Sequence, residues 1–113
     1  MKNIELTSVH VQKQWSQGLE DYITVRLIIN DVPSDTIITI SAGTDTDGSG
    51  GWNNDFEGLA KYDAEGNEIN YYVKEEAIYS GGVDCTAFYK NQVVPDSSNP
   101  YSFTIFNSYS TAG

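Results

Sequence analysis

The sequence predicts an all-β protein, an antiparallel β-sandwich of about seven strands. Three observations favour this fold class. β-branched and aromatic residues recur in short runs along the whole chain, turn-forming residues separate the runs, and no stretch has the spacing of an amphipathic helix. With 113 residues the chain is long enough for one core but too short for two, so we expect a single domain over residues 1–113. Residues 108–113 are expected to form a flexible tail or linker.

The strands follow from runs of apolar residues between turn signals. The first is expected over residues 4–15, before the turn Ser16-Gln17-Gly18, and the second over residues 22–29. A turn at residues 31–35 precedes a β-branched third strand at residues 36–40. Residues 43–51 are rich in Gly, Ser and Asp and are expected to form a flexible loop. The later strands are expected at residues 52–56, 70–76, 86–93 and 101–107, with chain breaks at residues 79–82 and 95–100.

Composition excludes several classes of function. The formal charge is −10, from 16 acidic and 6 basic residues, which makes nucleic acid or an anionic membrane surface a poor partner. No apolar stretch is long enough to span a bilayer, and residues 1–5 lack the apolar segment of a signal peptide. The chain is therefore expected to be either cytosolic or one domain of a longer exported protein. The single cysteine, Cys85, cannot form an internal disulfide.

Three polar residues occupy strand positions where an apolar side chain is expected. Because side chains alternate between the faces of a strand, Glu75 points the same way as Tyr71 and Val73. By the same parity, Lys13 lies in step with Val9, Val11 and Trp15, and Asn107 lies in step with Phe103 and Ile105. The sequence therefore predicts a lysine, a glutamate and an asparagine facing one core.

Two interpretations of these residues remain open from the pattern alone. The first is a buried ion pair between Lys13 and Glu75 with Asn107 hydrogen-bonded beside it, an arrangement that adds little stability. The second is chemical: burial lowers the pKa of a lysine and raises that of a glutamate, which gives a nucleophilic neutral amine and a neutral acid. A protonated Glu75 could polarise the Asn107 carboxamide and relay protons as ammonia leaves. The product would be an intramolecular isopeptide bond between Lys13 and Asn107.

The same stretches carry a family resemblance. The segments Val11-Gln12-Lys13-Gln14-Trp15 and Phe103-Thr104-Ile105-Phe106-Asn107, with the long central run from Gly58-Leu59 through Lys61-Tyr62-Asp63 to Val73-Lys74-Glu75, resemble the collagen-adhesin B-type (Cna-B) domain. The resemblance covers nearly the whole chain, apart from residues 79–99, which depart from the family pattern. It implies a reversed immunoglobulin-like, transthyretin-like topology. It also implies a Lys–Asn isopeptide bond, with Lys13 and Asn107 as the cross-linked residues and Glu75 as the catalytic acid.

The resemblance further implies a function. Domains of this family are stalk repeats of Gram-positive surface adhesins and pilins, so we expect an extracellular, cell-wall-anchored structural module rather than an enzyme. Its expected partners are neighbouring domains of the same surface protein, with no cofactor, no metal and no membrane insertion. The main alternative is a ligand-binding adhesin module whose loops, at residues 43–51 or 80–84, contact a host extracellular protein or glycan.

Other candidate sites are weaker. The run from Asp45 to Gly50 resembles the start of a calcium loop, but Phe56 stands where the bidentate glutamate belongs. Cys85 and His10 could be considered a nucleophile and base, yet His10 has outward parity and no third group orients it. Glu75 and Glu76 fail as a glycosidase pair because adjacent strand residues point to opposite faces.

Overall fold

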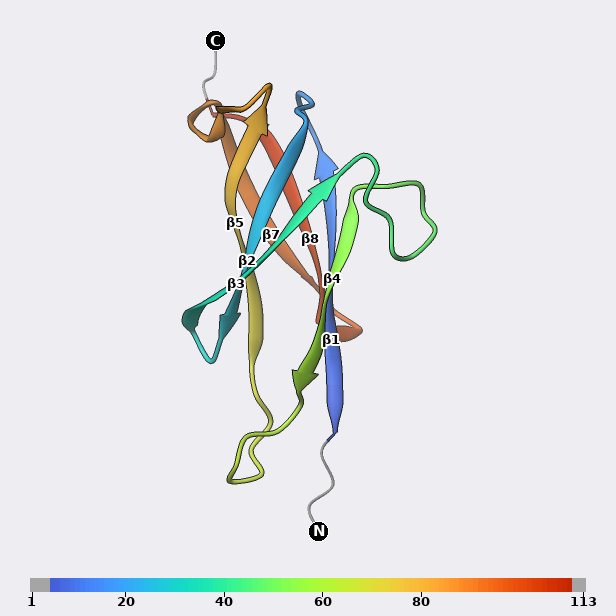
Figure 1. Ribbon diagram of the computed structural model, residues 1–113, viewed down its shortest axis with the longest axis vertical. Coiled ribbons are helices and arrows are strands. Elements are labelled where there is room, and N and C mark those ends of the chain that lie inside the picture. The colour runs from blue at the N-terminus through green and yellow to red at the C-terminus, as the bar shows by residue number, and fades with distance from the viewer. Residues whose placement is uncertain (1–4, 111–113) are drawn as a thin grey trace.

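The computed structural model consists of two four-stranded sheets packed face to face (Figure 1). The structure describes residues 5–110. The first sheet has the order β4-β1-β8-β7 and the second β3-β2-β5-β6. The strands are β1 (Leu6–Trp15), β2 (Tyr22–Ile29), β3 (Val32–Ser41), β4 (Asn53–Ala60), β5 (Tyr71–Ser80), β6 (Val83–Asp84), β7 (Tyr89–Asp96) and β8 (Asn99–Tyr109), and a short 3₁₀ turn, η1 (Thr86–Phe88), precedes β7. The predicted β-sandwich is confirmed, with eight strands in the described residues instead of about seven.

The strands pair antiparallel with one exception. β1 and β8 are neighbours in the first sheet and run parallel, with Lys13 opposite Ile105 and Trp15 opposite Asn107. The molecule measures 57 × 28 × 28 Å along its principal axes. Both strands run along the longest of these axes. The described chain therefore enters at one end of the sandwich and leaves at the other (Figure 1). This parallel pair brings the end of the first strand beside the end of the last one.

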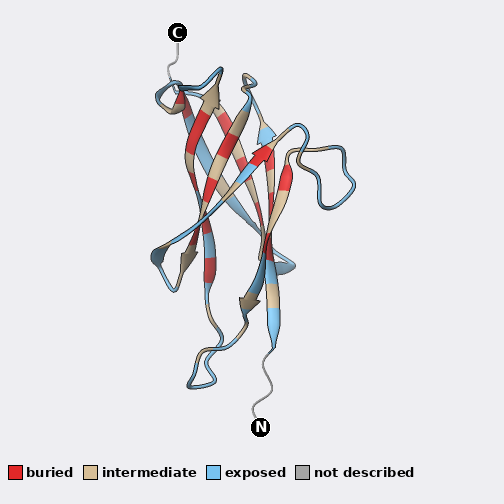
Figure 2. Cartoon of the chain, viewed as in Figure 1, coloured by how far each residue is buried: buried red, intermediate tan, exposed pale blue. Residues whose placement is uncertain are grey.

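The core lies between the sheets and follows the predicted alternation. Figure 2 shows buried residues recurring at intervals along the strands of both sheets. The fully buried apolar side chains of the core include Val9, Val11, Ile23, Val25, Leu27, Ile40, Val73, Ile78 and Ile105. Along β2, alternation places Ile23, Val25, Leu27 and Ile29 on the inner face; the first three are fully buried and Ile29, at the end of the strand, is half-buried.

The turn between β2 and β3 is shorter than predicted. Asn30 and Asp31 have φ angles of 48° and 68°, which places both in the left-handed region of a two-residue hairpin turn. Asn and Asp tolerate this conformation better than most residues, so the chain reverses there and β3 begins at Val32. Pro33, which suggested a longer turn, is accommodated because β3 is an edge strand.

The strand that carries Glu75 also differs from the prediction. Between β2 and β5 the register shifts around Glu76, so Val25 pairs with Glu75 while Thr24 pairs with Ala77. This β-bulge lets the strand continue to Ser80, where Gly81 and Gly82 turn the chain into β6. The strand predicted at residues 86–93 begins only at Tyr89, because η1 occupies Thr86–Phe88.

The two ends of the chain differ from the prediction in how far the strands extend. The predicted start of the first strand at Ile4 lies outside the described residues. At the other end, Ser108 and Tyr109 belong to β8 rather than to a tail, and the Ser110 hydroxyl donates a hydrogen bond to the backbone carbonyl of Ala87 at 2.9 Å. Of the predicted tail, residues 111–113 lie outside the described residues.

Candidate functional site: a buried lysine, glutamate and asparagine

The three predicted polar residues meet in the core. Lys13 on β1 is 2% exposed, Glu75 on β5 is 4% exposed and Asn107 on β8 is fully buried. Lys13 and Asn107 come from adjacent strands of the first sheet, and Glu75 comes from the second sheet. The inward orientation that strand parity predicted is therefore confirmed for all three side chains.

Backbone hydrogen bonds hold Lys13 and Asn107, the two residues predicted to be cross-linked, in place. The Lys13 amide donates to the carbonyl of Trp52 at 2.7 Å. The backbone carbonyl of Asn107 accepts hydrogen bonds from the amides of Ser16 and Gln17 at 2.8 and 3.2 Å. The turn that follows β1 is therefore bonded to Asn107. These bonds fix the backbones of Lys13 and Asn107 independently of their side-chain contacts.

The Asn107 carboxamide is bonded on its nitrogen but not on its oxygen. Nδ2 donates to Glu75 Oε1 at 2.9 Å and to the backbone carbonyl of Lys90 at 3.1 Å. Asn107 Oδ1 and Glu75 Oε2 are both buried, and neither has a hydrogen-bond partner among residues 5–110. Burying two hydrogen-bond acceptors without donors lowers the stability of the fold. A proton on the Glu75 carboxyl group would supply the donor that these two oxygens lack.

The Lys13 amine contacts an aromatic face rather than a carboxylate. Nζ lies 3.5 Å from the centroid of the Trp15 ring and donates to the backbone carbonyl of Gln14 at 2.9 Å. The Trp15 ring is itself held edge-on by Trp52 and Tyr89, at centroid distances of 5.4 and 5.3 Å. No ion pair joins Lys13 to Glu75 among residues 5–110, so the interpretation as a simple buried salt bridge is not supported.

Burial shifts both titratable groups toward their neutral forms. Desolvation lowers the pKa of Lys13 to about 7, against a smaller opposing effect of the Glu75 charge. Desolvation also raises the pKa of Glu75, and the hydrogen bond from Asn107 and the charge of Lys13 offset this only in part. Burial in this core therefore favours the neutral amine of Lys13 and the neutral acid of Glu75 relative to the same groups in water.

The weaker candidates do not assemble into sites. Cys85 is buried, its thiol contacts the backbone carbonyl of Ile78, and burial raises its pKa, while His10 contacts Asp47 and Asp55 instead. Glu76 pairs with Arg26 on the outer side of β5, away from Glu75.

The loop that resembled a calcium site also lacks a metal-binding cluster. The Asp45 carboxylate accepts hydrogen bonds from loop amides and from Asn53. Residues 5–110 contain no group of three His, Cys, Asp or Glu side chains arranged to hold a metal ion. They also contain no helix long and apolar enough to cross a membrane.

Two residues of these polar regions were not predicted. Trp15 was assigned to the inner face, but its contact with the Lys13 amine was missed, although residues two apart on a strand share a face. Asn53 is fully buried although it pairs with Gln12, a residue with outward parity on β1. A loop folds over Asn53 from outside the sheet, which alternation within a strand cannot reveal.

Together these features define a class of protein: a β-sandwich module with a lysine, a glutamate and an asparagine buried at one end of its core. The Cna protein B-type domain family matches residues 9–108, which is most of the chain. The protein therefore belongs to the Cna protein B-type domain family.

Solved structures agree with this assignment at the level of the fold. A single B repeat unit (B1) of the collagen binding surface protein of Staphylococcus aureus is similar to this chain, with a TM-score of 0.64 and 20% identity over 94% of the chain. A structure of two B repeat units (B1B2) of the same protein has a TM-score of 0.62 and 20% identity over 93% of the chain. The chain spans 51% of the first structure and 26% of the second. No curated protein sequence matches the chain.

Proposed function

We propose that this domain is a structural stalk module of a bacterial cell-surface adhesin or pilin, stabilised by an isopeptide bond that it forms once between Lys13 and Asn107. The observation that carries the proposal is the burial of all three groups in one core, with Glu75 hydrogen-bonded to the carboxamide that would react. Membership in the Cna B-type family and the likeness to repeat units of a surface protein support an extracellular location.

The reaction follows from the states that the core favours. Neutral Lys13 Nζ attacks Asn107 Cγ, which Glu75 polarises by donating a hydrogen bond from its protonated carboxyl group to Asn107 Oδ1. The Nζ–Cγ bond forms and the Cγ–Nδ2 bond breaks. Glu75 carries a proton from the attacking amine to the departing nitrogen, which leaves as ammonia. Positioning supplies much of the acceleration, because well-oriented groups reach effective molarities on the order of 10⁵ M or more.

The strand arrangement gives the bond a mechanical role. β1 and β8 are parallel neighbours, and the described chain enters and leaves at opposite ends of the long axis (Figure 1). Tension along this axis would slide the two strands past each other and load their hydrogen bonds in shear. A bond from Lys13 to Asn107 would carry the tension directly from β1 to β8 and leave the chain between these residues unloaded.

The intact mass of the denatured protein tests this proposal. We expect a mass lower than the sequence value by one ammonia, and a digest containing a peptide in which Lys13 is joined to Asn107. The Glu75→Gln variant keeps both reacting residues and the size of the side chain but removes the acid, so it should retain the full mass. Glu76→Gln is the matched control and should react like the parent. The full sequence mass in the parent protein, or a cross-link in Glu75→Gln, would contradict the mechanism.

A second candidate, a ligand-binding adhesin module, is favoured by one surface feature. Leu19, Phe88 and Tyr109 are exposed and line a shallow hollow with Glu20 and Tyr89. Exposed apolar side chains gathered in this way are typical of contact surfaces. Collagen, named for the S. aureus protein, is a direct probe: saturable binding that Phe88→Ser abolishes would support this function, and binding that is unchanged in Phe88→Ser would contradict a role of this hollow.

A further inference from the structure

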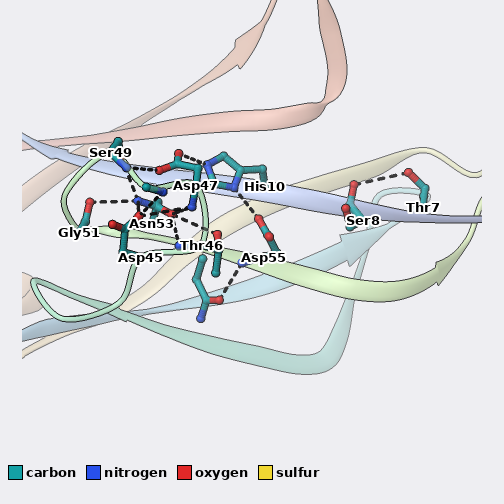
Figure 3. Close-up of polar contacts among 12 residues, drawn as sticks. Thr7, Ser8, His10, Asp45, Thr46, Asp47, Ser49, Gly51, Asn53 and Asp55 are labelled. Carbon is teal, nitrogen blue, oxygen red and sulfur yellow. Dashed lines mark hydrogen bonds and ion pairs between the residues drawn. The ribbon is translucent and has the colours of Figure 1, made fainter.

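The loop at residues 44–51 is built around a single buried side chain. Figure 3 shows the loop folded over Asn53, whose carboxamide contacts it from several sides. Asn53 Oδ1 accepts hydrogen bonds from the Thr46 amide, the Thr46 hydroxyl and the Asp47 amide at 2.7, 3.1 and 3.2 Å. Nδ2 donates to Asp45 Oδ1, Ser49 Oγ and the Gly51 carbonyl at 3.0, 3.2 and 3.1 Å. The loop predicted to be flexible therefore has a defined conformation.

A second contact joins the tip of this loop to the sheet. His10 lies on the outer face of β1 between two carboxylates, Asp55 on the adjacent β4 and Asp47 in the loop (Figure 3). Its Nδ1 is hydrogen-bonded to Asp55 Oδ1 and its Nε2 to Asp47 Oδ2, the latter at 2.9 Å. Asp47 uses its other oxygen to accept a hydrogen bond from the Ser49 amide at 2.9 Å.

The number of protons on the ring decides whether both contacts can exist. A neutral imidazole carries one N–H group, so it can donate to one carboxylate only and must present a lone pair to the other. The doubly protonated ring carries two N–H groups and a positive charge, and it satisfies both carboxylates at once. Hydrogen bonds from Ser49 lower the pKa of Asp47, with His10 contributing, so this carboxylate remains ionised and cannot supply the second proton.

The other charged groups near His10 do not change this count. Asp45 faces the amides of Gly48 and Gly50 and the Asn53 side chain rather than the ring. On β8, the residue opposite His10 is the uncharged Ser102. On β4, the next residue with the outward parity of Asp55 is Glu57, which is exposed and forms no ion pair among the described residues.

We propose that protonated His10 is a pH-sensitive clasp that holds the loop at residues 44–51 against β1 and β4. When the ring loses a proton, one of the two contacts must open. The contact with Asp47 is expected to open, because its side chain is 35% exposed and lies on a loop, whereas that of Asp55 is 20% exposed and lies on a strand. The Asp47 side chain then loses its link to β1, while the hydrogen bonds of Asn53 to the Asp47 amide and to Ser49 Oγ keep the loop folded over β4. The clasp does not depend on the proposed isopeptide bond.

Nuclear magnetic resonance tests the clasp directly, because His10 is the only histidine in the chain. A titration between about pH 5 and 8 spans the usual range of a histidine. We expect the ¹⁵N shifts of both ring nitrogens to show the doubly protonated form at the acidic end. The amide shifts of Asp47, Gly48 and Ser49 should follow the same midpoint as the ring. The protection of the Ser49 amide against hydrogen exchange, corrected for its intrinsic pH dependence, should fall by about tenfold as the ring deprotonates, as expected for a lost charged hydrogen bond.

Two variants separate the clasp from general effects of pH. His10→Gln removes the titrating ring, and Asp47→Asn keeps the size of the loop residue but removes its charge. In both, the loop amides should lose the response seen in the parent protein. Asp96→Asn changes an aspartate of another turn and should leave the response intact. A neutral His10 ring with both contacts present, or loop amides that respond equally in His10→Gln, would overturn the proposal.

Discussion

Two asparagines among residues 5–110 are fully buried, yet their side chains are in opposite states. Asn53 has six hydrogen-bond partners, three for its oxygen and three that share the two hydrogens of its nitrogen, and it holds a surface loop. Asn107 donates two hydrogen bonds from its nitrogen, and its oxygen has no partner in the described residues. The hydrogen-bonded carboxamide of Asn53 contributes to the structure of the loop, whereas the unpaired oxygen of Asn107 beside the Glu75 carboxyl group supports the proposed reaction.

The charged neighbours show the same contrast. On the outer face of β1, His10 lies between two carboxylates, and the protonated ring can satisfy both. On the inner face, Lys13 and Glu75 share a water-poor core without a direct ion pair, and burial moves both toward their neutral forms. The two polar clusters differ because one is open to solvent and the other is enclosed by the two sheets.

The largest expected effect comes from removing Asn107, the asparagine that we propose reacts with Lys13. In Asn107→Ala the proposed cross-link cannot form, and the domain should fold but lose much of its stability. By the chain-entropy relation used for disulfides, closing a loop of about 100 residues is worth roughly 4.7 kcal/mol. Chemical denaturation against the parent protein measures this loss. A difference near zero would mean that the bond either does not form or does not stabilise the fold.

Removing Asn53, which holds the loop at residues 44–51, should lower the stability of the domain by less than removing Asn107. Asn53→Ala leaves the loop amides and the Asp45 carboxylate without their buried partner, and we expect a loss of roughly 2–4 kcal/mol. The mass should still be lower by one ammonia, because this residue lies outside the reactive core. An Asn53→Ala protein that folds but retains the full sequence mass would show that the two clusters are coupled.

The smallest expected effect is a change in the rate of the proposed cross-linking reaction with pH. The productive state needs Lys13 neutral and Glu75 protonated. Protein in this state is most abundant between the two pKa values, the lowered pKa of Lys13, about 7, and the raised pKa of Glu75, so the rate should pass through a maximum there and fall at more acidic and more basic pH. Folding a chemically synthesised, unreacted chain at a series of pH values and following ammonia loss by mass spectrometry measures this profile. A rate that does not change between about pH 5 and 9 would exclude proton transfer by these groups.

Strand parity was sufficient to predict which side chains would be buried at the candidate site. Lys13 and Asn107 could be placed because regular alternation continues through β1 and β8, and Glu75 could be placed because the bulge in β5 begins only after it. The failed predictions fall where alternation does not apply. The two-residue turn at Asn30 and Asp31 depends on left-handed backbone conformations, and the loop over Asn53 depends on hydrogen bonds between segments.

The sequence by itself determined the fold class, the single core and the three polar residues that face it, because period-two alternation and turn chemistry are local properties of the chain. Only the tertiary structure decided how those residues meet. The parallel pairing of β1 with β8 and the Asn107 oxygen that lacks a partner in the described residues depend on strands distant in sequence. This is also true of Trp52 and Tyr89, whose rings hold the Trp15 ring beneath the lysine amine. The same holds for His10, whose outward position follows from alternation but whose two carboxylate partners come from a loop and a strand that only folding brings together.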